Sequence, residues 1–425
     1  MKLTVVGGGS TYTPELVDGI AGRRTSLAVD EIALVDPDMS RLEVVGGFAR
    51  RQLAHAGHPA RVTTTSDLEA GADGADAVLL QLRVGGQAAR ASDETFPLVC
   101  DCVGQETTGA GGLAKALRTV PVVLDIARRV REVAGGDAWI VNFTNPVGIV
   151  TRALLAEGHR AVGLCNVAIT FQRWTSALLG VDPEAVRLEH VGLNHLSWET
   201  GVFVDGVDRL PELLERHGDA LGEHIGLPAS LMRRLGMVPS YYLKYFYDHD
   251  EVVRAQKVEP PRAEVVAAVE KELLGLYGDV GVVTKPAQLS QRGGAYYSEA
   301  AVQLVHALTG GGGGGAQQHV VNVRNGGTLP FLPADAVVEV PAVVDGGGAV
   351  PLPVPPVPAT IAGLISHVTS YEQLALDAAL RGGRDRVAEA LLAHPLIGQH
   401  AVAERLADEL VARNADFLPW VKGTV

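Results

Sequence analysis

Short apolar runs alternate with stretches of helical periodicity over the first 165 residues of the chain. Near-continuous apolar strands separated by helices are typical of a parallel sheet that is covered on both faces. We therefore expect an α/β protein in which residues 1–168 form a Rossmann-type, doubly wound parallel sheet, with ligands bound beyond the carboxyl ends of its strands. The predicted strands are Leu3–Gly8, Glu31–Asp36, Ala77–Leu82, Ala138–Phe143 and Ala161–Cys165, and one of the helical stretches between them is Leu124–Ala134.

The pattern changes beyond about residue 170. We expect residues 169–425 to form an α+β domain that closes over the first, binds the substrate and carries the oligomer contacts. The six glycines Gly310–Gly315 are expected to be an expanded surface loop. The predicted elements are an antiparallel pair within Val186–Glu199 and Val202–Val207, helices within Glu212–Leu235, Ala263–Leu276 and Thr360–Ala415, paired strands within Val320–Asp345, and a proline-rich connection at Pro351–Pro358.

The composition is that of an ordinary globular protein, because 47% of the 425 residues are hydrophobic and 20% are charged. The formal net charge is −13 and the sequence has no Lys/Arg cluster of the type that binds nucleic acids, so we expect no nucleic-acid partner. Three cysteines in a chain of this length favour a reducing compartment. The N-terminus lacks the apolar core of a signal peptide, and no apolar stretch reaches the length of a membrane span. We therefore expect a cytoplasmic protein without a membrane partner.

The segment Val5–Leu16, VVGGGSTYTPEL, has the pattern of a phosphate-binding turn between a strand and a helix. Its glycines allow the backbone to approach a pyrophosphate, and the two hydroxyl residues after them add donors. Tyr12 stands where G-x-G-x-x-G has its third glycine, which changes the packing of helix on strand rather than the phosphate contacts. Asp36 closes the second strand, and an acid there favours NAD over NADP. The alternative is a tight turn that binds no ligand. The candidate NAD-binding residues are Gly7, Gly8, Gly9, Ser10, Thr11 and Asp36.

Several other segments are more polar than their surroundings require. Cys165 ends a predicted strand, and His195 follows 30 residues later in a similar Gly-Leu-polar context. A thiolate and an imidazole suit a divalent transition metal, although each residue alone is also typical of a buried structural position. Val238–Tyr247 holds four tyrosines at spacings that also fit an aromatic helix face. Arg262, at a helix entry, is either a surface residue or an anion clamp.

Together these segments resemble glycoside hydrolase family 4, the NAD-dependent, metal-requiring glycosidases, and most closely its 6-phospho-β-glucosidases. Most glycoside hydrolases work with a pair of carboxylates, and this NAD-dependent family is an exception. The resemblance runs from the first strand to about His400. It rests on long motifs in the right order, among them GGGSTYTPEL, GQETTGAGG, NFTNP, CNVAI, GLNH and VEVPAVVD.

The resemblance implies roles for individual residues. Cys165 and His195 would ligate a divalent metal, commonly manganese, and Tyr242 would act as the base, with Tyr241 as the adjacent alternative. Asn166 stands where α-specific members carry an aspartic acid that protonates the leaving group. A carboxamide cannot do this, so the pattern resembles the β-specific members and leaves the leaving-group acid unidentified. The residues implied in binding the phosphorylated sugar are Arg90, Asn145, Asn166 and Arg262, with Glu106 beside the site.

The reaction implied is hydrolysis of 6-phospho-β-glucosides such as cellobiose 6-phosphate or aryl glucosides. NAD would oxidise C3, the base would remove the acidified C2 proton, the leaving group would be eliminated, and water addition and re-reduction would follow. The resemblance also implies a homodimer or homotetramer. Two alternatives stay open at this point: an NAD-dependent 2-hydroxyacid dehydrogenase, which would produce NADH, and a non-catalytic NAD-responsive regulatory protein.

Overall fold

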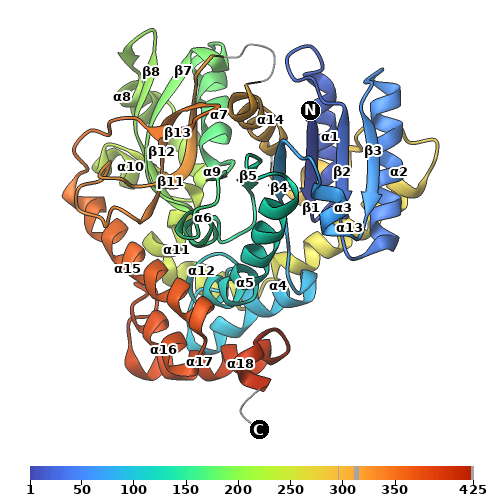
Figure 1. The fold of residues 1–425 in the computed structure, drawn as a ribbon. Helices are drawn as coiled ribbons and strands as arrows, with labels where there is room; N and C mark the ends of the chain where they lie inside the picture. The colour runs from blue at the N-terminus through green and yellow to red at the C-terminus, as the bar shows by residue number, and fades with distance from the viewer. Residues whose placement is uncertain (295, 311–314, 423–425) are drawn as a thin grey trace.

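A parallel sheet lies at the centre of the computed structural model, which describes residues 1–294, 296–310 and 315–422 (Figure 1). The order of its strands, numbered along the chain, is 3-2-1-4-5-6, as in a Rossmann fold. This confirms the predicted doubly wound sheet. The six strands are β1 (Lys2–Val6), β2 (Glu31–Val35), β3 (Arg61–Thr65), β4 (Ala77–Leu80), β5 (Trp139–Asn142) and β6 (Ala161–Gly163).

The strand β3 is the one parallel strand that the sequence pattern missed. Its sequence, RVTTT, has a single apolar residue, Val62, so it forms no apolar run. The strand lies at the edge of the sheet and pairs only with β2, and most of its side chains are not fully buried. An edge strand needs less apolar character than a central one, which is why alternation of apolar runs does not detect it.

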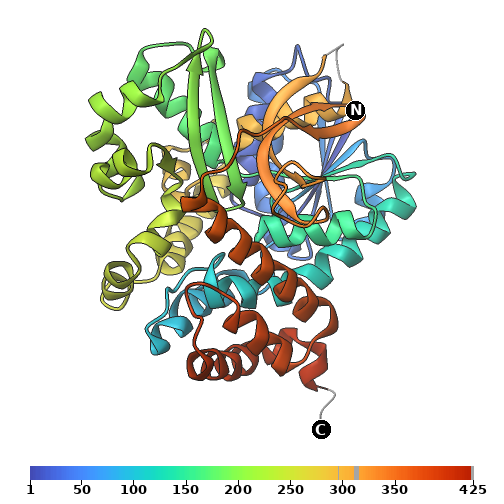
Figure 2. The ribbon, with the colours of Figure 1, turned by 90° about the vertical axis from the view of Figure 1, so that its left-hand side faces the viewer.

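Two groups of helices flank this sheet (Figure 2). In one group α1 (Thr13–Gly22) packs against α2 (Met39–His55) and α14 (Tyr297–Thr309). In the other α5 (Gly109–Val133) packs against α3 (Leu68–Ala72) and α6 (Val147–Ala156). The predicted helical stretch Leu124–Ala134 is the second half of α5. Because α14 comes from the second half of the chain, the two halves interlock at the sheet.

The strands of the second half extend the same sheet in antiparallel fashion. Asn322 pairs with Gly163 at the join between the halves. The predicted boundary at residue 168 falls just after the start of α7 (Val167–Leu179), and the division into two domains stays a prediction. The added strands, in order from β6, are β11 (Gln317–Arg324), β12 (Val337–Asp345), β7 (Val186–Leu193), β8 (Leu196–Val204) and β10 (Val238–Pro239), with β9 (Val207–Asp208) and β13 (Gly348–Pro351) beside this path.

The β7–β8 hairpin turns earlier than the sequence predicted. The pattern placed the break between Glu199 and Val202, whereas the turn lies at Asn194 and His195. Leu193 and Leu196 on either side are both buried, so the apolar pattern continues through the turn, which has neither glycine nor proline at its two central positions. His195 has φ = 63°, an uncommon backbone conformation for a non-glycine residue.

The remaining helices surround the sheet and form a lower lobe. The stretch Glu212–Leu235 is divided into three helices by breaks at His217 and Gly226. The predicted C-terminal helical region is confirmed, and its helices pack on α5 (Figures 1 and 2). These helices are α4 (Gly86–Thr95), α8 (Leu210–Arg216), α9 (Gly218–Ile225), α10 (Ala229–Leu235), α11 (Lys244–Tyr247), α12 (His249–Gln256), α13 (Arg262–Gly278), α15 (Ala359–Arg381), α16 (Arg384–Leu392), α17 (His400–Asn414) and α18 (Pro419–Lys422).

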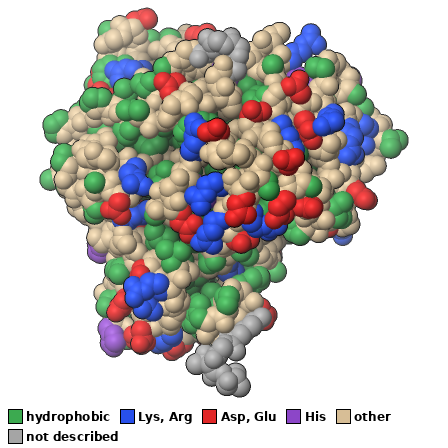
Figure 3. All heavy atoms as spheres, viewed as in Figure 1, with side chains coloured by type: hydrophobic (Ala, Val, Ile, Leu, Met, Phe, Trp, Pro, Cys, Tyr) green, Lys and Arg blue, Asp and Glu red, His purple; other side chains and the backbone are tan. Residues whose placement is uncertain are grey.

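Charged side chains of both signs lie interspersed on the face drawn in Figure 3. No helix within the described ranges is long and apolar enough to span a bilayer. The predicted glycine loop at Gly310–Gly315 cannot be compared, because residues 311–314 lie outside the described part of the chain.

Candidate active site

The glycine turn between β1 and α1 is closely packed against the neighbouring strands. Gly7 has φ = +89°, and a Cβ there would lie 2.7 Å from the carbonyl oxygen of Gln81. A Cβ on Gly8 would lie 2.8 Å from Leu34 Cβ. The amide of Gly9 donates to Asp36 Oδ2 at 3.0 Å. The turn therefore requires glycine on steric grounds, and Asp36, the candidate ribose ligand, lies directly against it.

Tyr12 joins the glycine turn to the second half of the chain. Its hydroxyl donates to the carbonyl oxygen of Gly294, and its ring meets that of Tyr297 edge to face, with 6.0 Å between centroids. Where the usual fingerprint has a glycine that lets helix and strand approach, this chain has a side chain that holds a distant segment in place. Tyr12 therefore connects the glycine turn to the start of α14.

An arginine that the sequence did not reveal also reaches this turn. Arg292 ends the short 3₁₀ helix Ala287–Arg292, and it donates to Thr11 Oγ1 at 2.8 Å. It also pairs with Glu270 of α13 at 3.1 Å. Its guanidinium lies over the ring of Tyr12, 5.5 Å from the centroid. A fixed cation beside the candidate phosphate turn is suited to an anionic ligand. Nothing around Arg292 in the sequence signals this, since 281 positions separate it from Thr11.

Cys165 and His195 lie at the ends of different strands and near the same tyrosine, Tyr242. Cys165 lies just beyond the carboxyl end of β6, and His195 is at the β7–β8 turn; both are buried. The rings of His195 and Tyr242 stack, with 3.6 Å between centroids and 13° between planes. Burial raises the pKa of Tyr242, and Tyr241 and then Cys165 add to this, so Cys165 lies near the phenol. The structure therefore brings together the three residues that the sequence proposed for metal binding and proton transfer.

The surroundings of His195 favour a neutral imidazole. Burial lowers the pKa of His195 to about 4, so the ring carries no charge at neutral pH. Its Nδ1 is 2.9 Å from the hydroxyl of Thr107, which leaves Nε2 as the nitrogen directed elsewhere. A hydrogen bond at one ring nitrogen commonly orients the other toward a metal. Thr107 was not singled out from the sequence, although it lies in the GQETTG motif.

Among the described residues, the main influences on the pKa values of Cys165 and Tyr242 include no positive charge. Burial raises the pKa of the Cys165 thiol, and the carboxylate of Glu339 adds to this. Burial also raises the pKa of Tyr242, with contributions from Tyr241 and Cys165. Within the described ranges no three His, Cys, Asp or Glu residues converge as a complete ligand set. A cysteine and a histidine, completed by substrate or water, nevertheless fit a divalent metal, because its charge would favour the thiolate and the phenolate.

The tyrosine-rich segment is short and bent. Tyr241 and Tyr242 lie in a 3₁₀ turn, Tyr241–Leu243, that leads into the four-residue helix α11. Their rings have centroids 4.5 Å apart. The tyrosines of Val238–Tyr247 therefore do not form the single regular helix face that was the alternative interpretation.

Glu106 lies at the centre of a buried ionic cluster. Its carboxylate accepts from Lys115 Nζ at 2.6 Å and from Arg83, and it lies 3.3 Å from Arg90 Nε. Burial raises the pKa of Glu106, but the three cations outweigh it and hold that pKa well below its ordinary range. Burial lowers the pKa of Lys115 to about 8. The cluster has more positive than negative charge close to Glu106, which leaves capacity for an anion.

Arg90 and Arg262 are connected through Glu94. Arg90 Nε donates to one oxygen of Glu94 at 2.7 Å, and the amide of Ala263 donates to the other at 2.7 Å. Glu94 thus fixes the start of α13, where Arg262 is the first residue, beside α4. Arg262 is exposed, and its side chain donates to the carbonyl oxygen of Gln291 at 2.7 Å.

The two candidate asparagines lie at the carboxyl edge of the parallel sheet. Asn145 follows β5, and its side-chain oxygen is buried without a hydrogen-bond partner among the described residues. Such an atom costs free energy unless a ligand pairs with it. Asn166 precedes α7 at the N-cap position. Both asparagines therefore lie where a Rossmann-type sheet binds its ligands.

A buried His–carboxylate relay was also missed by the sequence analysis. His190 donates from Nδ1 to Glu199 at 2.7 Å and from Nε2 to Glu339 at 3.0 Å. Burial lowers the pKa of His190, but the two carboxylates outweigh it and raise the pKa to about 10. Glu339 also accepts from Asn194 at 3.1 Å, next to His195 in the hairpin turn. The relay therefore braces the turn that carries His195.

Two family models match the chain. "Family 4 glycosyl hydrolase" matches residues 2–181, and "Family 4 glycosyl hydrolase C-terminal domain" matches residues 190–397. The chain is 38% identical to a "Probable 6-phospho-beta-glucosidase" of Bacillus subtilis, over 99% of this chain and 97% of the relative. It is 36% identical to a "6-phospho-beta-glucosidase" of Escherichia coli, over 99% and 96% of the two chains.

Solved structures agree with these matches. The 6-phospho-β-glucosidase of Thermotoga maritima, determined with NAD and glucose-6-phosphate, superposes with a TM-score of 0.91 at 33% identity. The superposition covers 98% of this chain and 99% of that one. A second structure of that enzyme, with manganese, NAD+ and glucose-6-phosphate, has a TM-score of 0.90 at 32% identity and the same coverage of both chains.

Proposed function

The chain belongs to family 4 of the glycosyl hydrolases, and on this premise we propose that it is an NAD- and divalent-metal-dependent 6-phospho-β-glucosidase. The resemblance expected from the sequence is thereby confirmed. The observation that carries the proposal is the stacking of Tyr242 on His195 beside Cys165. That arrangement puts a candidate base against a candidate metal site at the sheet edge where the fold binds ligands.

We propose a binding site in this chain for each cofactor. Gly7, Gly8, Gly9, Ser10, Thr11 and Asp36 would bind NAD, supported by the close packing of the turn and by Arg292 beside it. Cys165 and His195 would hold the metal, with Mn²⁺ as our candidate, supported by the neutral imidazole. When bound, NAD accepts and returns a hydride, and the metal polarises oxygens of the sugar as a Lewis acid.

Tyr242 performs the proton transfer in this proposal. Once C3 of the sugar is a ketone, the hydrogen on C2 is acidic, and Tyr242, held as a phenolate by the charge of the metal, would accept it as a proton. The bond from C1 to the leaving-group oxygen then breaks, and that oxygen departs with a proton. Water would then add at C1 while C3 is still a ketone, a proton would return to C2, and return of the hydride to C3 would complete the hydrolysis. Positive charge held at Cys165 and His195 is needed to counter the raised pKa of Tyr242.

The phosphorylated sugar is assigned to the cationic region. We propose that Arg90, Arg262 and Asn145 bind it. Glu94 pairs with Arg90 and with the amide of Ala263 at the start of the helix that Arg262 begins, and the unpaired oxygen of Asn145 supports a ligand beside that residue. Glu106 holds Arg90 in place. Asn166, a carboxamide at the head of α7, supports β rather than α specificity because it cannot protonate a leaving group.

Assembly and compartment are proposals of the same kind. We propose a homodimer or homotetramer in the cytoplasm. The three cysteines, all free in the structure, support a reducing compartment.

The test is an assay with 4-nitrophenyl β-D-glucoside 6-phosphate, with and without NAD and Mn²⁺. Hydrolysis that depends on both additions, without net NADH, is expected. Absence of hydrolysis under every combination would refute the assignment. Accumulation of NADH with a 2-hydroxyacid would support the dehydrogenase alternative instead, and binding of NAD without any turnover would support the regulatory one.

A further inference from the structure

The sulfur of Cys165 lies among hydrogen-bond donors from two parts of the chain. Burial raises the pKa of the thiol. Hydrogen bonds from the amide of Val167, the side chain of Asn194 and the amide of Asn166 act in the opposite direction. The two amides belong to the start of α7, where free N–H groups favour an anion, and Asn194 belongs to the β7–β8 turn. A sulfur with these donors is suited to the thiolate form, which is the form that binds metals.

Asn194 also donates to a second acceptor, the carboxylate of Glu339. The side-chain nitrogen of Asn194 lies 3.1 Å from Glu339 Oε2. Burial raises the pKa of Glu339, but hydrogen bonds from His190 and from two asparagines outweigh it and lower that pKa, so the group is a carboxylate at neutral pH. A carboxylate only accepts hydrogen bonds, so it must face the NH₂ group of Asn194 and not the carbonyl oxygen. Because both N–H bonds lie on that nitrogen, the bond to Glu339 leaves the other N–H for the sulfur of Cys165.

Glu339 is itself fixed on both of its oxygens. Its Oε1 accepts from His190 Nε2 at 3.0 Å. Its Oε2 accepts from Asn322 Nδ2 at 2.8 Å as well as from Asn194. Glu339 is 1% exposed, so no bulk water competes for these bonds. The carboxylate therefore has one defined position from which it orients Asn194.

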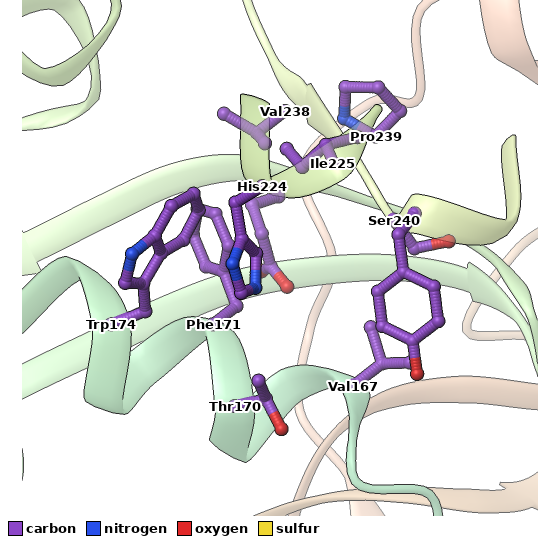
Figure 4. Close-up of a pocket in the computed structure, with 11 residues that line it drawn as sticks. Val167, Thr170, Phe171, Trp174, His224, Ile225, Val238, Pro239 and Ser240 are labelled. Carbon is purple, nitrogen blue, oxygen red and sulfur yellow. The ribbon is translucent and has the colours of Figure 1, made fainter. Parts of the chain in front are cut away.

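The far end of the His190 relay borders a small pocket between α7 and the segment that contains β10 (Figure 4). Glu199, which accepts from His190 at 2.7 Å, lines this pocket together with Val167 and Ser240. The pocket has space for about one water. Glu199 Oε2 has no hydrogen-bond partner among the described residues, and a water is a partner of the right size. The relay thus ends in a space for water, which suits a support for Glu339 and not a ligand site.

The contacts of Asn194 differ from those of an ordinary turn residue. An asparagine in a turn commonly bonds to the backbone of the turn itself. The Asn194 side chain instead reaches Glu339 in β12 and Cys165 beyond β6, both outside the hairpin. The next residue in the turn is His195. One turn therefore carries one proposed metal ligand and a hydrogen-bond partner of the other.

We propose that Asn194 is a positioning residue of the metal site: held by Glu339, it donates to the sulfur of Cys165 and keeps that sulfur oriented as a ligand. This inference rests on the proposed function, since it requires a metal at Cys165 and His195. A hydrogen bond to a metal-bound sulfur draws electron density from it and so sets the properties of the metal–sulfur bond. Contacts that orient a ligand in this way typically change metal affinity by about 10- to 100-fold.

The test uses Co²⁺ as the probe, with NAD present, because a bond between Co²⁺ and a thiolate gives a charge-transfer absorption band in the near ultraviolet. Asn194→Leu and Asn322→Leu form a matched pair. Each removes one donor to Glu339 Oε2, but only Asn194 also reaches Cys165. Without its hydrogen bond the sulfur gives up electron density more readily, so the band of Asn194→Leu should move to longer wavelength. Asn322→Leu should keep the band at the wild-type position.

Metal affinity gives a second readout that does not depend on turnover. Titration of free Mn²⁺ by electron paramagnetic resonance should show a Kd about tenfold or more above that of the wild type in Asn194→Leu. The Kd of Asn322→Leu should stay within about threefold of the wild type. Asn194→Ala, which adds no apolar bulk to the turn, should reproduce both changes of Asn194→Leu. Melting temperatures of all variants identify any that are unfolded.

The outcomes separate the positioning role from the proposed function. An unshifted band and unchanged Mn²⁺ affinity in folded Asn194→Leu or Asn194→Ala would overturn the positioning role and leave the proposed function intact. Equal band shifts in Asn194→Leu and Asn322→Leu would assign the effect to Glu339 and would also overturn it. If the wild type gives no charge-transfer band with Co²⁺ and binds no Mn²⁺, the metal site fails, and the proposed function fails with it.

Discussion

The ring of Tyr242 lies parallel to that of His195, with 3.6 Å between their centroids. Because of this contact, the pKa of Tyr242 should depend on the charge of a metal bound at His195. Without a cation, the neighbouring groups act to keep the phenol protonated, because burial, Tyr241 and Cys165 all raise the pKa of Tyr242. The base and the metal site therefore act as one unit, and substitutions at and around them should separate their contributions.

Tyr242→Phe should remove the proton acceptor without disturbing the stack. We expect kcat to fall about 10²- to 10⁴-fold with a smaller change in KM, as for loss of a positioned acid–base group. Tyr241→Phe is the matched control, since its ring is adjacent, and it should retain much of the activity. Steady-state kinetics with saturating NAD and Mn²⁺ measures both. The reverse ranking of the two variants would make Tyr241 the base.

Thr107→Val should weaken metal binding although Thr107 is not a proposed ligand. Its hydroxyl lies 2.9 Å from His195 Nδ1 and fixes the orientation of the ring. Loss of such an outer contact typically costs about 10- to 100-fold in metal affinity. Titration of free Mn²⁺ by electron paramagnetic resonance gives the affinity directly, and Thr107→Ser, which keeps the hydroxyl, is the control. Unchanged Mn²⁺ affinity in Thr107→Val would show that His195 does not need this bond.

Arg292→Gln should weaken NAD binding. Arg292 is held beside the glycine turn by its hydrogen bond to Thr11 and its ion pair with Glu270. A hydrogen bond to a charged group contributes about 1.5–3 kcal/mol. We expect the Kd for NAD to rise about tenfold or more, with partial recovery in Arg292→Lys. Isothermal titration calorimetry measures this, with Arg254→Gln, which breaks an exposed pair with Glu251, as a control. Equal NAD affinity in wild type and Arg292→Gln would show that the arginine only links the chain's two halves.

The His190 relay predicts loss of stability at high pH. The pKa of His190 in the folded protein is raised to about 10 from an ordinary value of 6.5. Its protonated form therefore stabilises the fold fully below pH 6.5, and this contribution is lost as the pH rises through about 10. Urea unfolding of the wild type should show the free energy of unfolding falling across this window.

Two variants test the relay's contribution. Glu199→Gln removes one of the carboxylates that raise the pKa of His190, so the loss should be smaller and should be complete at a lower pH. His400→Gln, an exposed histidine elsewhere, should leave the profile unchanged. A profile in Glu199→Gln that runs parallel to the wild type would contradict a charged His190.

The sequence predicted the parts of the fold that depend on local pattern. Apolar runs such as those of β1 and β4 are buried on both faces and so are continuous in the sequence, and their order along the chain gives the Rossmann arrangement. The edge strand β3 was not predicted, because its sequence is largely polar. That the strands of the second half extend the same sheet depends on the long-range pairing of Asn322 with Gly163, which no local pattern encodes.

The residues of the candidate site also fall into two groups, those that the sequence could predict and those that only the structure shows. Gly7, Cys165 and His195 could be proposed because each lies in an unusual motif, and Tyr242 because of the resemblance. Arg292 contacts Thr11 across 281 positions, so its part in the turn follows only from the packing of α13 and α14. Glu199 has the pattern of an ordinary polar position in a strand, and its pairing with His190 depends on how β7 and β8 lie against each other.

The most direct test of the proposed mechanism is the position of deuterium in the product after hydrolysis in D₂O. If Tyr242 removes the C2 proton and later returns one that has exchanged with solvent, the glucose 6-phosphate formed should carry deuterium at C2. Proton nuclear magnetic resonance of the purified product, with the unreacted sugar phosphate incubated in parallel, gives the answer. Deuterium at C2 in enzymatic product alone is the predicted result. Hydrolysis that leaves C2 fully protonated would mean direct displacement at C1 and would contradict the proposed mechanism.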